Sequence, residues 1–101
     1  MSVVVTISYP AAPDAVFDLE YYTSTHLPFV ESRYKPHGLT SWHVTKFGEG
    51  ELYTYQFTMF FETMEGYAAA SAESREAVVA DIAKLSNKTP VRSVGQIFLK
   101  G

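Results

Sequence analysis

The middle of the chain, residues 39–61, reads LTSWHVTKFGEGELYTYQFTMFF. Residues 39–47 and 52–61 alternate between apolar and polar side chains, which is typical of strands that bury one face. The glycine-containing segment 48–51 between them predicts a short connection and therefore an antiparallel hairpin. In the second of these strands the side chains of Tyr53, Tyr55, Phe57, Met59 and Phe61 fall on one face. We expect helices to cover this face of the sheet.

The pairing of the two strands is expected to keep their apolar side chains together, because residues directly across an antiparallel pair point the same way. A register that pairs Trp42 with Phe57 meets this condition and places His43 opposite Gln56. A slip by one residue would mix rings with hydroxyl groups. His43 is therefore expected on the face of the sheet opposite the rings.

A strand and a helix are predicted before the hairpin. Residues 3–9 are β-branched, and a loop containing two prolines follows them. Asp18 can cap a helix that ends near Gly38. Pro28 lies inside this helix without an amide hydrogen, so the helix should kink or divide near His26.

A helix and a strand are predicted after the hairpin. Thr63 can cap the helix, which continues to Leu85 with a break expected near Glu73 and Ser74. Residues 91–100 form the last strand. The order strand, helix, strand, strand, helix, strand predicts an α+β, ferredoxin-like split βαβ fold with a four-stranded antiparallel sheet.

Composition narrows the classes of function. The 101 residues are enough for one domain, predicted over residues 1–101, and the absence of cysteine excludes disulfides and thiol catalysis. A net charge of -3 without a basic run argues against nucleic acid as a partner. The N-terminus has no signal-peptide pattern and no apolar run is long enough to cross a bilayer, so we expect no membrane partner and a cytoplasmic location.

His26 is the main candidate for chemistry. It is predicted on the core-facing side of the first helix together with Tyr22 and Phe29. An apolar pocket favours neutral imidazole, which can accept a proton. The alternative is a core histidine whose ring is satisfied by a tyrosine hydroxyl or a backbone carbonyl.

The other two histidines are weaker candidates. His43 is expected on the opposite face of the sheet, and His37 in a Pro-His-Gly turn is expected in solvent. The three histidines lack the spacing of a metal-binding motif, so no metal site is predicted.

Three segments resemble the EthD family: FDLEYY at 17–22 continuing to THLPFV at 25–30, GLTSWHVT at 38–45, and FETMEGY at 61–67. The resemblance implies a dimeric α/β barrel and cofactor-free chemistry. The wider superfamily includes monooxygenases, cyclases, isomerases and decarboxylases that act on aromatic, lactone and polyketide-like substrates. The family's recurrent histidine corresponds to His26, and its paired tyrosines correspond to Tyr21 and Tyr22.

We therefore expect a cofactor-independent enzyme with acid/base chemistry on a hydrophobic, carbonyl-bearing or aromatic metabolite. His26 and Tyr22 are the predicted catalytic residues, and the predicted substrate-binding residues are Phe29, Trp42, Tyr55, Phe57 and Tyr67. The uncovered face of the sheet predicts a homodimer that buries roughly 800 Å² per subunit. The alternatives are a non-catalytic protein that binds a small molecule and an accessory dimer with an aromatic core.

Overall fold

The computed structural model describes residues 2–101. The elements follow in the order β1 (Val3–Pro10), α1 (Leu19–Tyr21), the π-helix η1 (Tyr22–His26), α2 (Leu27–Tyr34), the 3-10 helix η2 (Lys35–His37), β2 (Leu39–Lys46), β3 (Tyr53–Phe61), α3 (Met64–Ile82) and β4 (Val91–Gln96). The strands form one antiparallel sheet in the order β2-β3-β1-β4. The predicted ferredoxin-like fold is confirmed.

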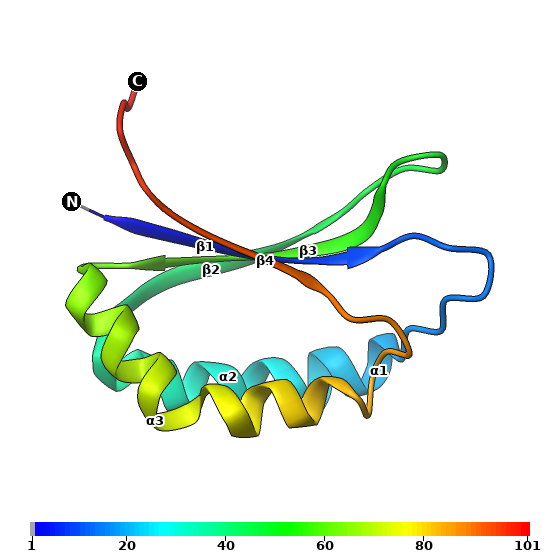
Figure 1. The fold of residues 1–101 in the computed structure, drawn as a ribbon, viewed down its shortest axis with the longest axis horizontal. Coiled ribbons are helices and arrows are strands. Elements are labelled where there is room, and N and C mark those ends of the chain that lie inside the picture. Colours follow the sequence, from blue (N-terminus) through cyan, green and yellow to red (C-terminus); the bar gives the residue numbers. More distant parts are fainter. Residues whose placement is uncertain (1) are drawn as a thin grey trace.

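The molecule has two layers, which Figure 1 shows with the sheet nearly edge-on and α1, α2 and α3 together on one side of it. In residues 2–101 no helix or strand covers the other face of the sheet. The core fills the space between the layers, where Val5, Phe57 and Phe61 of the sheet meet Val30 and Ile82 of the helices. The ring-rich face of β3 is thus the covered face, as its alternation predicted.

The register of the hairpin differs from the predicted one by two residues. Trp42 pairs with Met59 and His43 pairs with Thr58. A shift of two leaves every side chain on its predicted face, so alternation alone cannot distinguish the two registers. The connection decides between them, because the Phe47 amide donates to the Thr54 carbonyl at 2.9 Å and extends the ladder beyond Lys46.

The second long helix is continuous, and the break predicted near Glu73 and Ser74 is wrong. Thr63 caps α3 as expected, since its side chain accepts from the Gly66 amide at 3.0 Å. From Gly66 to Ile82 the sequence is rich in alanine and other good helix formers and contains no proline, so nothing interrupts the helix. The buried face of α3 includes Ser74. This polar side chain interrupts the row of apolar residues along the helix, and the interruption led to the prediction of a break.

The last strand is shorter than predicted, ending at Gln96 instead of Lys100. Phe98 and Leu99 beyond it are more than four-fifths exposed, at 85% and 82%. The chain leaves the sheet there on the side away from the helices (Figure 1). Across residues 2–101, no helix combines the length and the apolar character needed to span a membrane.

Candidate active site

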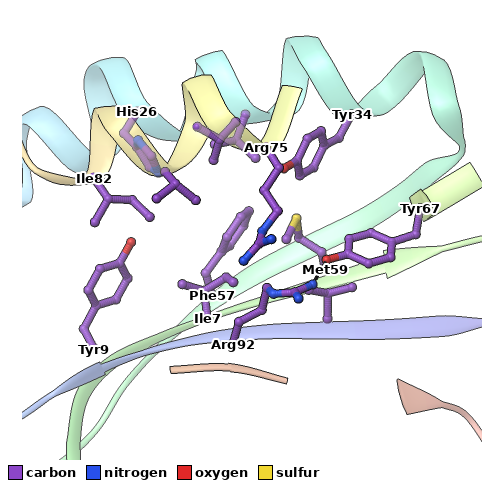
Figure 2. Close-up of a pocket in the computed structure, with 14 residues that line it drawn as sticks. Ile7, Tyr9, His26, Tyr34, Phe57, Met59, Tyr67, Arg75, Ile82 and Arg92 are labelled. Carbon is purple, nitrogen blue, oxygen red and sulfur yellow. Dashed lines mark hydrogen bonds between the residues drawn. The ribbon is translucent and has the colours of Figure 1, made fainter. Parts of the chain in front are cut away.

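A cavity lies between the sheet and the helices, and Figure 2 shows the side chains that surround it. Its volume is about 40 Å³, and the empty space rises to about 460 Å³ only when the open mouth and the adjoining solvent are included. Its apolar lining consists of Val5, Ile7, Val30, Phe57, Met59, Val78, Val79 and Ile82, and its polar lining of Tyr9, His26, Tyr34, Tyr67, Arg75 and Arg92. Arg75, Val79 and Arg92 are the exposed members, so the cavity opens between α3 and β4.

A local change of helix type places His26 in this cavity. In η1 the Leu27 amide donates to the carbonyl of Tyr22, five residues earlier, instead of four. Pro28 follows immediately and cannot donate a backbone hydrogen bond, which accounts for the predicted irregularity at this point. Tyr22 and His26 are both buried, and their rings lie 6.0 Å apart at an interplanar angle of 17°. The π-turn thus fixes His26 against a rigid aromatic neighbour.

His26 forms a buried pair with Asp81 of α3. The distance from His26 Nδ1 to Asp81 Oδ2 is 2.9 Å, and the two side chains are only 3% and 13% exposed. A carboxylate can only accept, so the neutral ring carries its proton on Nδ1 and keeps the lone pair of Nε2 for a ligand. The histidine therefore has the orientation that a general base requires.

Two further groups surround the Asp81 carboxylate. The Tyr21 hydroxyl donates to Oδ1 at 2.6 Å, and Lys84 Nζ lies 3.6 Å from the same oxygen. Burial acts to raise the pKa of Asp81, but the hydrogen bonds from Tyr21 and His26 and the charge of Lys84 outweigh it and lower that pKa. The same bond, helped by burial, raises the pKa of Tyr21. Asp81 is thus held as a carboxylate beside the imidazole.

The predicted site residues divide into two groups. His26, Phe57 and Tyr67 line the cavity, whereas Tyr22 and Tyr55 do not. Both of these tyrosines belong to an aromatic cluster with Phe17 and Tyr9. Burial strongly raises the pKa of Tyr22, and its hydroxyl has no hydrogen-bond partner in residues 2–101.

Phe29 and Trp42 also lie away from the cavity lining. Trp42 Nε1 donates to Glu31 Oε2 at 2.7 Å, and the ring packs edge-on against Phe57 with centroids 5.6 Å apart. Phe29 is half-buried, with the guanidinium of Arg33 5.2 Å from its ring centroid. Both side chains support the walls from outside.

Sequence reasoning missed Asp81, Tyr9, Tyr34, Arg75 and Arg92. Asp81 is 55 positions from its partner, and only the packing of α3 on η1 brings the two together. The position of Arg92 could have been predicted from the sequence. In β4, side chains two residues apart lie on the same face, so Arg92 shares a face with Val94 and not with Val91 or Ser93. Its partner across the ladder is Ile7, which lines the cavity.

The two remaining histidines are outside the cavity. His37 Nε2 lies 2.8 Å from Glu73 Oε2, and His43 is exposed on the open face of the sheet beside Phe60. Among the residues from 2 to 101, no three His, Asp or Glu side chains converge as a metal site would require.

No protein-family model and no curated protein sequence matches the chain. Solved structures do match. An EthD-like protein from Ralstonia eutropha JMP134 has a TM-score of 0.84 at 22% identity, over 99% of this chain and 95% of that one. An ethyl tert-butyl ether degradation (EthD) family protein from Bacillus halodurans C-125 has a TM-score of 0.74 at 20% identity, over 97% and 100%.

A third match is SnoaB from Streptomyces nogalater, a cofactor-independent oxygenase, with a TM-score of 0.65 at 10% identity over 98% of this chain and 93% of that one. All three cover nearly the whole of both chains, so the likeness concerns the complete arrangement of sheet and helices. The chain therefore has the fold of the EthD-like proteins, which the resemblance of its sequence predicted.

Proposed function

We propose that the chain is an EthD-type enzyme in which His26 acts as a general base on a small apolar substrate. The observation that carries the proposal is the buried contact of 2.9 Å between His26 Nδ1 and Asp81 Oδ2 at the wall of an apolar cavity. A histidine oriented by a carboxylate and facing an apolar space is a recurrent arrangement for proton transfer.

The proposed step is the removal of one proton from the substrate. Nε2 of His26 accepts it from an acidic C–H or phenolic O–H group, and the substrate becomes an enolate or phenolate. The imidazolium that forms is stabilised by the Asp81 carboxylate, which Tyr21 and Lys84 keep ionised. Tyr22, whose ring lies nearly parallel to the imidazole, acts as a positioning residue.

The lining of the cavity supports an apolar, carbonyl-bearing or aromatic substrate. Phe57, Met59 and Val30 offer surfaces that favour rings and alkyl groups. Formation of an enolate or phenolate is a first step that isomerases, cyclases, decarboxylases and cofactor-independent oxygenases can share. SnoaB is a cofactor-independent oxygenase, and its likeness to this chain supports a reaction without a bound cofactor.

A generic probe for a base in an apolar pocket tests this proposal without knowledge of the substrate. 5-Nitrobenzisoxazole opens to a coloured phenolate when a base removes its ring proton. We expect the wild type to accelerate this reaction and His26→Gln to lower the rate by about 100-fold. The matched control is His37→Gln, which changes a histidine outside the cavity and should keep the wild-type rate. Equal rates in the wild type and His26→Gln would overturn the proposal, leaving a binding protein as the alternative.

We also propose that a second copy of the chain covers the open face of the sheet. Val4 and Phe60 on this face are half-buried and Val91 is 46% exposed, while Phe98 and Leu99 extend beyond it with their side chains in solvent. A stable dimer buries about 800 Å² per subunit, which a four-stranded sheet can supply. Light scattering of the purified protein at micromolar concentration should give twice the chain mass of 11.3 kDa. A monomer under those conditions would contradict the dimer.

A further inference from the structure

Two arginines stand at the mouth of the cavity without a carboxylate partner. Two of the three arginines in the chain, Arg75 and Arg92, line the cavity. The ion pairs within residues 2–101 involve His26, His37, Lys84 and Lys88 as cations, and neither of these arginines. Two guanidinium groups at the mouth of one apolar cavity form a positive pair whose planar forks can hold a carboxylate or phosphate.

The position of the two arginines marks the boundary between the apolar interior and solvent. A wider surface depression adjoins the cavity and shares its residues Ile7, Arg75, Val79, Ile82 and Arg92. Figure 2 shows both guanidinium groups on the same side of the cavity, with the Arg75 side chain reaching down from α3 toward the sheet. A ligand with its apolar part inside would place its outer end between them.

Tyr67 adds a third donor at this position. Arg92 Nη1 donates to the Tyr67 hydroxyl oxygen, so the hydroxyl hydrogen remains available for another acceptor. Tyr34 lies close by: burial and the neighbouring Tyr67 raise its pKa, and the charges of Arg75 and Arg92 oppose that rise. Two guanidinium groups and a buried hydroxyl therefore converge on one end of the cavity.

The base and the arginines are separated along α3. Asp81, which holds His26, is six residues beyond Arg75, and this spacing corresponds to about 9 Å along a helix axis. A ligand that reaches both ends would have a charged group near the arginines and its reacting carbon several ångströms further in.

We propose that the cavity takes an amphipathic anion, an apolar ligand whose oxyacid end is held by Arg75, Arg92 and the Tyr67 hydroxyl. The oxyacid is a carboxylate or a phosphate monoester, both of which match the planar fork of arginine. This assignment names the substrate class of the same cavity, and so it rests on the proposed function.

The first test compares neutral and charged ligands of one shape on the wild-type protein. Titrations followed by NMR would use 4-phenylbutanoate, 3-phenylpropyl phosphate and the uncharged 4-phenylbutanamide. We expect at least one anion to bind about tenfold more tightly than the amide, and the preferred anion identifies the oxyacid. An amide that binds as tightly as both anions, or no binding of any of the three, would overturn the proposal.

The second test assigns the preference to the two arginines. Arg75→Gln and Arg92→Gln should each lower the affinity for the preferred anion far more than the affinity for the amide, and so remove most of the anion preference. The matched control is Arg33→Gln, which removes the same charge from a residue beside Phe29 and outside the cavity. An equal loss of preference in Arg33→Gln would show a general charge effect and overturn the assignment.

The outcome separates this site from the catalytic proposal. Equal binding of amide and anions together with a His26-dependent rate on 5-nitrobenzisoxazole would overturn the anion site alone. A selective anion site without a His26-dependent rate would overturn the general base and keep the ligand class.

Discussion

Two histidine–carboxylate pairs connect α3 to the first helical segment of the chain, and they share almost the same geometry. The distance between nitrogen and oxygen is 2.9 Å for His26 and Asp81, and 2.8 Å for His37 and Glu73. Their surroundings differ. The side chains of the first pair are 3% and 13% exposed, and those of the second are 24% and 59% exposed.

The difference shows that burial, and not distance, decides what such a pair does. Water competes for both groups of the exposed pair and screens their attraction, so its contribution to stability is small. Water does not reach the buried pair to replace a lost partner, so removal of one side chain leaves a polar atom of the other without a hydrogen bond. His26 of the buried pair lines the cavity between sheet and helices and His37 does not, so the orientation of the His26 ring can serve chemistry there.

The largest expected effect is on the buried pair. Asp81→Ala should lower the free energy of unfolding by about 2–3 kcal/mol, because it leaves Nδ1 of the buried His26 without an acceptor. Asp81→Asn keeps an amide oxygen as an acceptor and should cost clearly less. Urea denaturation measures both values. A loss in Asp81→Ala no greater than in Glu73→Ala would remove the distinction between the two pairs.

A somewhat smaller effect is expected beside the exposed pair, from backbone packing. A Cβ atom at Gly66 would lie 2.3 Å from the carbonyl oxygen of His37, far closer than atoms approach. Gly66→Ala should therefore destabilise the protein by about 1–2 kcal/mol, although alanine favours a helix by about 1 kcal/mol over glycine. Urea denaturation measures the change.

The control for that variant is Ala72→Gly, at an exposed position in the same helix. It should be destabilising by about 1 kcal/mol from helix propensity alone. A Gly66→Ala variant that is more stable than the wild type would contradict the close approach of α3 to the His37 carbonyl. The exposed histidine pair would then be the main connection there.

The same contrast explains how much of the molecule the sequence could predict. The alternation around Phe57 and the caps at Asp18 and Thr63 are local patterns, and each has the predicted role. The two-residue register error leaves all faces unchanged, so local alternation contains no information about it. The false break in α3 comes from Ser74, whose burial depends on packing between layers.

Only part of the candidate site could be predicted from the sequence. His26 could be found because it lies one turn from Tyr22 and close before Pro28. Asp81 could not, since an acid near the end of a long helix usually lies in solvent, and its role depends on contact with a residue 55 positions away. Trp42 is of a residue type that often contacts ligands, but here its indole N–H donates to Glu31.

The pH dependence of stability gives a finer test of the buried pair. The pKa of Asp81 is lowered in the folded protein, so its contribution is complete above the unfolded-state pKa of about 3.9 and is lost as the pH falls through the lower folded value. The groups that face it are Tyr21, His26 and Lys84. The stability gap between the wild type and Asp81→Asn should therefore narrow as the pH falls below about 4. A gap that widens below about pH 4 in urea denaturation would contradict the assigned direction.

The smallest effect on stability is expected at the exposed pair of His37 and Glu73, although its distance is as short as that of the buried pair. Glu73→Gln removes the charge from the exposed pair but keeps an oxygen and a nitrogen near His37 Nε2. Because the Glu73 side chain is 59% exposed, the change in the free energy of unfolding should be at most about 0.5 kcal/mol, with no change in the rate on 5-nitrobenzisoxazole. Urea denaturation in low and high salt measures it, and the small loss should disappear in high salt. A loss as large as that of Asp81→Ala would mean that the two pairs are equivalent, and burial would no longer explain why only His26 is suited to accept a proton.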